Sequence, residues 1–324
     1  MSRILITGAR GYIGSALSLR LAADGYALRL VSRSPAVARS VPENGEMIEY
    51  CQADLRDETS WLALLEGADA VVHLSARTDL HAAEADPAAD ADINVEPIRA
   101  LLRAAERREI ATPVIFASST SIVGATHANP VNEQTPDRPC SVYDRHKLES
   151  ESLLKDATKR SVIASCSLRL PTVYGYGAGV ASANPSRGVL NGVIRRAAQG
   201  QASQIYGTGH YIRDFIFIDD VVDAFCRALS SEQVRTGNSY VIATGRGYSI
   251  ADAFLQIARE AHRATGCAIQ MRHVPEPSHL HPIERSSFVG DSTLFRRLTG
   301  WRPKMDLDAG IRDYFQRLLG ETHP

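Results

Sequence analysis

Short apolar runs alternate with helix-patterned segments through the first 170 residues, and this alternation constrains the fold more than any other feature of the sequence. Parallel strands need a crossover between them, usually a helix, so the pattern predicts a parallel sheet with helices on both faces. We therefore expect an α/β fold with a doubly wound parallel sheet. The expected strands are residues 4–7, 27–31, 48–51, 70–74, 113–117 and 164–170. The expected helices are residues 12–24, 59–65, 98–106 and 143–155.

A glycine-rich turn joins the first strand to the first helix, with Gly8, Gly11 and Gly14 in the sequence TGARGYIG. These glycines permit a tight turn, a close approach of the backbone to a phosphate, and close packing of helix on strand. The helix N-terminus that follows offers unpaired N–H groups to a pyrophosphate. The turn therefore predicts a Rossmann-type dinucleotide site. The cofactor contacts expected here are Gly8, Arg10, Gly11, Tyr12, Ile13 and Gly14.

The end of the second expected strand indicates which dinucleotide is bound. An acidic residue at this place would hydrogen-bond the ribose hydroxyls of NAD. Here the chain has Ser32 and Arg33 and no carboxylate, and a guanidinium beside a hydroxyl suits the 2′-phosphate of NADP. We expect NADP(H), with NAD as the alternative cofactor. The simplest alternative for Arg33 itself is a solvated loop charge that contacts no cofactor. After the third strand, Asp54 and Leu55 are expected to contact the adenine.

The regular alternation ends at residue 170, and Gly, Pro, Ser and Asn are frequent in residues 171–188. We expect a dinucleotide-binding domain of residues 1–170, to which the chain returns near residues 214–245. Residues 171–324 are expected to form mainly a smaller, C-terminal substrate-binding domain. The later elements expected are helices at 189–199 and 221–229 and strands at 214–218 and 240–243.

The composition excludes several classes of protein. The chain of 324 residues is 44% hydrophobic and 23% charged, which is typical of a globular protein rather than a disordered or fibrous one. Its formal net charge of −1 gives no indication of binding to nucleic acid or to an anionic membrane. The sequence has no signal-peptide pattern and no apolar run of membrane-spanning length, and its five cysteines are scattered without a CxxC pair. We expect a cytoplasmic protein with reduced thiols.

Three neighbouring histidines, His273, His279 and His281, raise the alternative of a metal site. Their spacing matches no common zinc pattern, and no cysteine or acidic pair joins them. We therefore expect a histidine-rich loop and no bound metal.

Tyr143 and Lys147 stand four residues apart at the start of an expected helix, so their side chains share one face. A phenol has a pKa of about 10 and is a weak base at neutral pH, but a neighbouring ammonium lowers that pKa. The spacing YxxxK is common by chance. It gains weight here because the preceding strand ends in the hydroxyl residues 118–121, and the C-terminal ends of parallel strands face the ligand crevice.

These motifs occur in the order and spacing of the extended short-chain dehydrogenase/reductase family, and the chain resembles its nucleotide-sugar epimerase, dehydratase and ketoreductase group. The glycine turn, the segment HLSA at 73–76, the segment SSTSIVG at 118–124 and the YxxxK motif all match. Two further segments are more specific, LRLPTVYG at 168–175 and YGTGHYIRDFIFIDD at 206–220. The resemblance covers nearly the whole chain, and it implies a homodimer.

The resemblance assigns roles to individual side chains. Tyr143 would be the acid/base, and Lys147 would lower its pKa and anchor the nicotinamide ribose. Ser119 occupies the position of the hydroxyl that hydrogen-bonds the substrate oxygen, with Thr120 as the alternative. Further substrate contacts would come from Asn94, from Arg213 to the diphosphate, and from His281. Further cofactor contacts would come from Leu74, Ser75, Ala76 and Pro171.

The chain departs from the family pattern at several places, one of them Val123, where the family has a tyrosine. Family dehydratases have an Asp-Glu pair directly after the catalytic hydroxyl residue, whereas Thr120 and Ser121 stand there in this chain, so we do not expect 4,6-dehydration. Where many members have Arg-Pro-x-Asp, this chain has His281 to Glu284. A histidine binds phosphate more weakly than an arginine and only when protonated. Arg285 is the alternative phosphate ligand.

Three functions fit these features. The first is a 4-ketoreductase, in which NADPH reduces a nucleoside-diphosphate 4-keto-6-deoxy-sugar while Tyr143 protonates the emerging alkoxide and Ser119 polarises the carbonyl. The missing acid after the second strand and the missing Asp-Glu pair favour it. The alternative is an NAD-dependent nucleotide-sugar 4-epimerase that uses the same residues with a tightly bound cofactor. The third is a non-enzymatic NADP-sensing regulator, which would not need Tyr143, Lys147 and Ser119 together.

Overall fold

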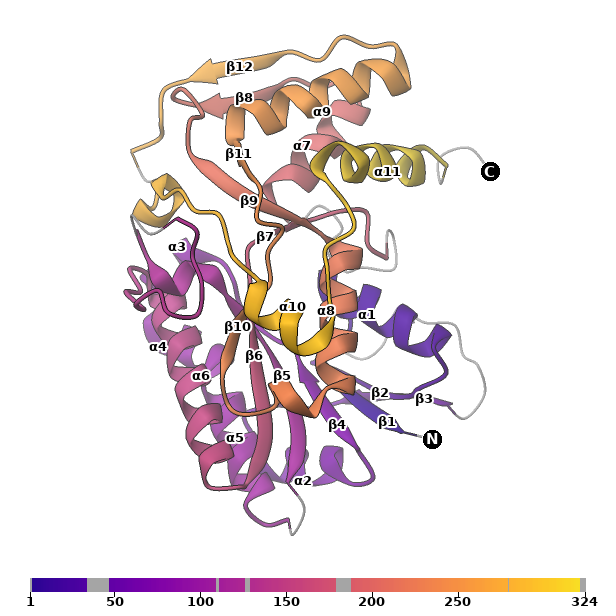
Figure 1. Cartoon of the computed structure of the whole chain (residues 1–324), viewed down its shortest axis with the longest axis vertical. Coiled ribbons are helices and arrows are strands. Elements are labelled where there is room, and N and C mark those ends of the chain that lie inside the picture. The colour runs from indigo at the N-terminus through magenta and orange to yellow at the C-terminus, as the bar shows by residue number, and fades with distance from the viewer. Residues whose placement is uncertain are drawn as a thin grey trace.

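A parallel sheet forms the centre of the molecule (Figure 1). The computed structural model describes residues 2–33, 47–108, 111–125, 129–178, 188–278 and 280–320. Within these ranges the sheet has seven strands in the order β10-β6-β5-β4-β1-β2-β3, and all neighbours run parallel. The predicted doubly wound α/β fold is confirmed. The strands are β1 (Arg3–Thr7), β2 (Ala27–Ser32), β3 (Ile48–Gln52), β4 (Ala70–His73), β5 (Thr112–Ser119), β6 (Ile163–Leu170) and β10 (Ser239–Val241).

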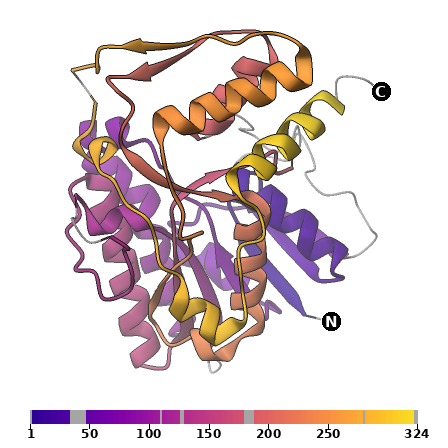
Figure 2. The same cartoon turned by 45° about the horizontal axis from the view of Figure 1, so that its top comes forward.

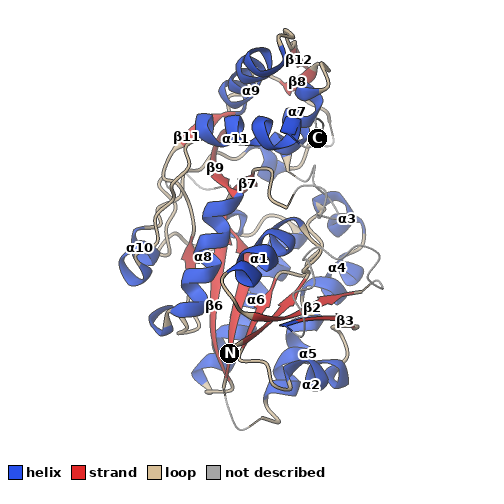
Figure 3. Cartoon of the chain, turned by 90° about the vertical axis from the view of Figure 1, so that its right-hand side faces the viewer, coloured by secondary structure: helices blue, strands red, loops and turns tan. Residues whose placement is uncertain are grey.

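Helices cover both faces of this sheet (Figure 3). Successive side chains of a strand point to opposite faces, so Ile4 and Ile6 pack with Leu17 on one side while Leu5 packs with Trp61 on the other. The two apolar clusters hold the helices against the sheet. The first face carries α1 (Tyr12–Ala23), α8 (Ile218–Ser230) and α10 (Thr293–Thr299). The second face carries α2 (Glu58–Leu65), α5 (Glu96–Ala105) and α6 (Val142–Lys159).

A smaller group of elements lies at the top of Figures 1 and 2, around a core that includes Tyr174, Phe217, Ile257 and Tyr314. It contains a three-stranded sheet, β11-β9-β7, and a two-stranded sheet, β12-β8. Strand β10 follows residue 170 in the chain but joins the main sheet. The predicted domain division stays a prediction. The elements of this group are β7 (Thr172–Tyr174), β8 (Ser203–Tyr206), β9 (Ile212–Phe217), β11 (Gly247–Ser249), β12 (Met271–Val274), α7 (Val189–Ala198), α9 (Ile250–Thr265) and α11 (Leu307–Gly320).

Some elements differ from the sequence-based expectation. The strand expected at 214–218 is β9, which pairs with β7 and β11 instead of joining the main sheet. Two helices without a prediction, α3 (Leu80–Ala85) and α4 (Pro87–Asn94), have little apolar periodicity and begin where the carboxylates of Asp79 and Asp86 cap the backbone. The short 3-10 helices are η2 (Thr120–Val123), η4 (Glu232–Val234) and η5 (Pro282–Arg285).

None of the helices in the described ranges combines the length and the apolar character that a membrane crossing requires. All five cysteines, at positions that the structure describes, are free thiols. Cys166 is fully buried, and burial raises the pKa of its thiol to about 12, which makes it a packing residue rather than a nucleophile.

Candidate active site

A cavity of about 430 Å³ opens at the C-terminal ends of β1, β2, β4, β5 and β6. Ligands of doubly wound sheets bind at this edge, and the volume is that of a small-molecule site. The structure brings most of the predicted residues together in its wall. Those that line the cavity are Gly8, Arg10, Gly11, Tyr12, Ile13, Gly14, Ser32, Arg33, Leu55, Leu74, Ser75, Ala76, Ser119, Tyr143, Lys147 and Pro171.

The glycine turn forms one wall and leaves no room for side chains. The Gly11 N–H donates to the Gly8 carbonyl oxygen at 2.8 Å, and no side chain caps the N-terminus of α1. A Cβ on Gly14 would lie 2.2 Å from the Gly8 oxygen, and a Cβ on Gly8 would lie 2.8 Å from the backbone nitrogen of Ser75. The first-turn N–H groups of α1 are therefore left for an anion, as a pyrophosphate requires.

Ser32 and Arg33 line the cavity at the end of β2, where a dinucleotide would place its adenosine ribose. Asp54 is not part of the lining, and its predicted contact with the adenine stays a prediction. Its carboxylate is held by Arg56, with 2.6 Å between Asp54 Oδ2 and Arg56 Nη2. That hydrogen-bonded pairing lowers the pKa of Asp54 to about 2. Leu55 alone of this predicted pair faces the cavity.

Tyr143 and Lys147 lie on one face of α6, and both line the cavity. Ser141 is the N-cap of α6, and its hydroxyl accepts the N–H of Asp144 at 3.0 Å. Lys147 Nζ lies 5.8 Å from the centre of the Tyr143 ring and 2.8 Å from the Ala117 carbonyl oxygen, to which it donates. A cation at this distance favours the phenolate form of a tyrosine, which is what a general base needs.

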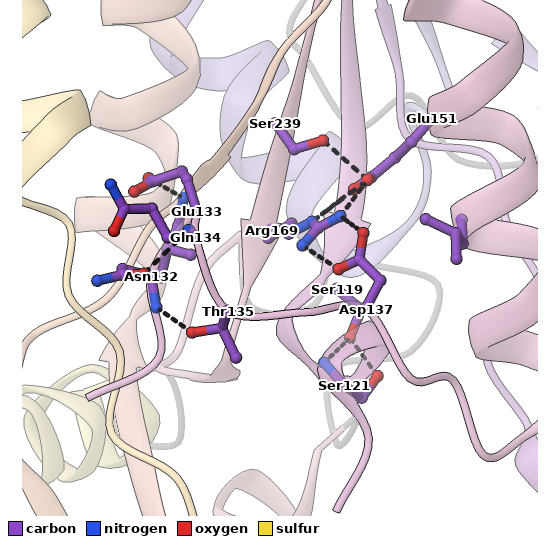
Figure 4. A network of polar contacts seen from close by, with 12 residues as sticks. Ser119, Ser121, Asn132, Glu133, Gln134, Thr135, Asp137, Glu151, Arg169 and Ser239 are labelled. Atoms are coloured by element: carbon purple, nitrogen blue, oxygen red, sulfur yellow. Dashed lines mark hydrogen bonds and ion pairs between the residues drawn. The ribbon is translucent and has the colours of Figure 1, made fainter. Parts of the chain in front are cut away.

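The hydroxyl of Ser119 is connected to a buried carboxylate that the sequence analysis does not single out. Ser119 Oγ lies 2.7 Å from Ser121 Oγ, and Figure 4 draws these two serines. Ser121 Oγ in turn donates to Oδ1 of Asp144. Ser141 Oγ donates to Oδ2 of the same carboxylate at 2.6 Å. Asp144 is fully buried; burial raises the pKa of its carboxyl, and the two hydroxyl donors oppose that rise. Its only signal in the sequence is an acidic residue inside the YxxxK motif.

Ser118 is a further cavity residue without a predicted role. It lines the cavity, and its buried Oγ has no hydrogen-bond partner within the described chain. An unpaired buried hydroxyl facing a cavity is the mark of a site shaped for a polar ligand group. Together with the glycine turn and Arg33, it shows that the residues present fit a nicotinamide dinucleotide.

Two predicted substrate residues, Asn94 and Thr120, point away from the cavity. Thr120 is buried in η2 and donates to the Leu170 carbonyl oxygen at 3.2 Å. The amide of Asn94 is buried, accepts from the Arg77 N–H at 3.0 Å and donates to the Arg77 oxygen at 2.9 Å and to Asp90. Neither residue is part of the cavity lining, and their predicted contacts with the substrate stay predictions.

Arg213 and His281 lie together at η5, outside the cavity lining. Arg213 donates to the carbonyl oxygens of Glu284, at 2.7 Å, and of Ser286, and burial lowers the pKa of its guanidinium. His281 Nδ1 accepts the N–H of Ile283 at 3.2 Å. Both side chains therefore hold the same segment, and their role as phosphate ligands stays a prediction.

The histidines considered for a metal do not gather into a site. Among the residues that the structure describes, no three His, Cys, Asp or Glu side chains form a group that could hold a metal ion. His273 Nδ1 contacts the Gly207 carbonyl oxygen at 2.8 Å. His279 lies outside the described residues.

The fold and the cavity define a class of protein. It is the class of dinucleotide-binding α/β proteins that have a serine, a tyrosine and a lysine in a cavity at the C-terminal ends of the parallel strands. The model of the NAD dependent epimerase/dehydratase family matches residues 4–243. The chain belongs to this family, within the extended short-chain dehydrogenases/reductases. The predicted resemblance is thereby confirmed.

Individual relatives are similar over their whole length. A UDP-glucose 4-epimerase of Mycolicibacterium smegmatis is 32% identical over 95% of this chain and 96% of its own. A solved UDP-glucose-4-epimerase from Stenotrophomonas maltophila, with bound NAD and formylated UDP-arabinopyranose, is 26% identical, with a TM-score of 0.85 over 99% of this chain and 100% of its own. RMD from Pseudomonas aeruginosa, complexed with NADPH, is 25% identical, with a TM-score of 0.77 over 98% of both chains.

Proposed function

We propose that this protein is a nucleotide-sugar 4-epimerase that acts on a UDP-sugar. The observation that carries the proposal is the end-to-end similarity to the UDP-glucose 4-epimerase of M. smegmatis, at 32% identity. The solved relative with NAD and a UDP-sugar supports it. The proposal adopts the alternative of the sequence analysis in place of the 4-ketoreductase, because both relatives described above whose names state a reaction are 4-epimerases.

The residues of the cavity have distinct tasks in this reaction. A nicotinamide held in the cavity would supply the hydride chemistry that inversion at C4 requires. Tyr143 takes the proton of the 4-hydroxyl and gives it back when the hydroxyl is restored. Lys147, with its ammonium 5.8 Å from the phenol ring centre, stabilises the charged form of that tyrosine. Ser119, at the end of β5, contacts the same sugar oxygen and fixes its position.

The residues and the relatives differ on the cofactor. Ser32 and Arg33 line the cavity where an NAD enzyme has an acid, and this favours the 2′-phosphate of NADP. The solved epimerase at 26% identity holds NAD, whereas RMD at 25% identity holds NADPH. The specific observation of Arg33 in the wall keeps an NADPH-dependent 4-ketoreductase as the second candidate function.

One experiment separates the candidates. The purified protein is denatured, the released dinucleotide is identified, and the native protein is assayed with UDP-glucose and UDP-arabinopyranose for interconversion at C4. An epimerase retains its dinucleotide and turns over without added cofactor. Turnover of a 4-keto-6-deoxy-sugar that consumes stoichiometric NADPH, with no C4 interconversion, would overturn the proposal in favour of the reductase.

The Tyr143→Phe variant tests the remaining alternative, a regulator that senses NADP. An enzyme loses about 100-fold or more of its turnover when its acid/base is removed, while the dinucleotide stays bound.

A homodimer also stays a prediction. The outward side of α5 and α6 carries ion pairs, among them Arg99 with Glu149 at 2.6 Å and Arg103 with Glu96 at 2.7 Å.

A further inference from the structure

A second pocket, of about 160 Å³, is lined by β9, by β11 and by the chain that enters α11. These elements lie together in the upper half of Figure 1. The wall contains Phe215 of β9, Tyr248 of β11 and residues 303–307. Of the described residues that line this pocket, none also lines the active-site cavity. The two sites are therefore separate, and what this pocket binds does not depend on the proposed 4-epimerase function.

Three donor side chains in the wall have no partner elsewhere in the described chain. The guanidinium of Arg246 and the ammonium of Lys304 form no ion pair and no side-chain hydrogen bond with any described residue, and the hydroxyl of Tyr248 forms no hydrogen bond there. The charge of Lys304 acts on the buried Asp220, but that carboxylate already accepts the N–H groups of Lys304 and Met305, at 2.8 and 3.1 Å. The pocket thus offers two cations and a phenol to a ligand.

The missing acidic partners distinguish Arg246 and Lys304 from other cations of the same group of elements. Arg263 of α9 lies 3.7 Å from Glu260. On α11, Arg312 lies 3.8 Å from the same glutamate, and Arg317 lies 2.9 Å from Asp313. The positive charge at the pocket is therefore not neutralised in the way that the charge on the two helices is.

Two further polar side chains of the wall are already engaged. Thr244 Oγ1 donates to Oδ1 of the buried Asp214 at 2.7 Å, so its proton is not available to a ligand. Asp306 is the acid in the wall, and its Oδ1 accepts the N–H of Ala309 at 2.8 Å. Two positive charges and one negative charge leave the lining with a net charge of +1, which favours an anionic ligand.

The size of the pocket and the number of donors indicate which anion fits. Pockets that enclose a whole drug-sized ligand have volumes of about 300–1,000 Å³, so a pocket of about 160 Å³ takes a group of a few atoms. A phosphate ester presents three terminal oxygens as strong acceptors, one for each donor, whereas a carboxylate presents two oxygens. Guanidinium and ammonium groups both bind phosphate through charge-assisted hydrogen bonds.

We propose that this pocket binds the phosphate group of a small molecule through Arg246, Lys304 and the hydroxyl of Tyr248. Both cations are exposed, so the pocket is open to solvent and the rest of the ligand would lie on the surface outside it. The shared chemistry is the phosphate group itself, which either free phosphate or a phosphate ester supplies.

The first test is a calorimetric titration with inorganic phosphate. The protein is saturated beforehand with the dinucleotide that it releases on denaturation, so that phosphate does not bind at the glycine turn. Arg246→Gln and Lys304→Gln should each raise the Kd about tenfold, because each removes a charge-assisted contact. Tyr248→Phe should raise it about threefold, because it removes one neutral hydrogen bond. A wild-type Kd weaker than about 10 mM, or equal Kd values in the wild type and both charge variants, would overturn the proposal.

The matched control is Arg302→Gln, two residues before Lys304. Arg302 is also exposed and also lacks an ion pair with the described residues, but it does not line the pocket. Its removal should change the Kd of phosphate less than about twofold, because solvent and salt screen a charge outside the pocket. A loss equal to that of Lys304→Gln would show attraction to a positive surface and overturn the pocket as the site. Unchanged unfolding temperatures and dinucleotide affinities verify that the variants fold.

The second test separates the two sources of the phosphate group by titration with UMP and with uridine. If UMP binds more tightly than inorganic phosphate and Arg246→Gln weakens it, the pocket takes a phosphate ester. If phosphate binds as tightly as UMP and Arg246→Gln weakens both, free phosphate is sufficient. Uridine should bind equally to the wild type and to Arg246→Gln. A uridine affinity that falls in Arg246→Gln would overturn the phosphate group as the recognised feature.

Discussion

The ammonium of Lys147 donates a 2.8 Å hydrogen bond to the carbonyl oxygen of Ala117, two residues before the end of β5. Lys147 is only 3% exposed, so this bond holds a buried cation between the strand that ends in Ser119 and the helix that carries Tyr143. Its Nζ also lies 4.4 Å from the centre of the Phe116 ring. The strand thereby fixes the distance between the charge and the phenol, on which the proposed acid/base chemistry depends.

Lys147→Met tests this arrangement. We expect kcat of C4 interconversion to fall about 100-fold or more, because the phenolate of Tyr143 loses its cation. The control is Lys155→Met, two turns further along α6 and exposed, which should leave kcat unchanged. Steady-state kinetics over a pH range measures both variants. Equal activity of Lys147→Met and the wild type would contradict the assigned role.

Arg33→Asp tests the adenosine end of the cavity. If Arg33 contacts a 2′-phosphate, the variant should lose its preference for NADP over NAD by about tenfold or more, the equivalent of one charge-assisted contact. Arg56→Ala is the control, since Arg56 lies nearby but is held by Asp54 outside the cavity lining. Calorimetry on protein freed of bound dinucleotide gives the dissociation constants of NADP and NAD, and their ratio tests the role of Arg33. An unchanged ratio would mean that Arg33 is a solvated charge.

His73 should make stability depend on pH. It is fully buried against Trp61 and Phe116, and burial, with the charge of Lys147, lowers the pKa of its imidazole to about 3. The unfolded chain titrates near the ordinary value of about 6.5, so between these values the unfolded state binds more protons. The stability that His73 contributes is present above about pH 6.5 and is lost toward pH 3, at up to about 1.4 kcal/mol per pH unit.

The free energy of urea unfolding is measured for the wild type and for His73→Asn between about pH 4 and pH 8, a range that includes the unperturbed imidazole pKa of about 6.5. The difference between the two proteins should shrink as the pH falls below that value. Parallel curves for both proteins would show that His73 does not titrate differently in the folded state.

A buried ion-pair cluster around Arg169 should contribute to stability (Figure 4). Arg169 on β6 contacts Glu151 of α6 and Asp137, each at 2.6 Å, and Ser239 of β10 donates to Glu151 at 2.8 Å. Glu151→Ala leaves a buried guanidinium with one partner and should cost about 3 kcal/mol of unfolding free energy.

The matched control for this cluster is Glu149→Ala on the same helix, which removes the exposed pair with Arg99 and should cost less than about 1 kcal/mol. Chemical denaturation of both variants gives the comparison. Equal losses would mean that the cluster around Arg169 is worth no more than a surface ion pair.

Local sequence was enough to predict those parts of the molecule that depend on neighbours in the chain. The spacing of Gly8, Gly11 and Gly14 specifies the turn between β1 and α1, because these glycines are close together in the chain. Tyr143 and Lys147 share a face of α6 because four residues make about one helical turn. The order of strands and helices follows from local apolar periodicity in the same way. These features predicted the sheet and most of the cavity wall.

The directions of the polar side chains near the site depend on how distant segments pack together. Asn94 and Thr120 stand at positions that the family pattern assigns to the site, yet packing turns them onto the backbone of Arg77 and Leu170. Asp144 meets Ser121 across 23 residues of chain, and Arg213 meets Glu284 across 71. Such contacts depend on how separate elements pack against one another, and the periodicity of a single segment contains no information about that packing.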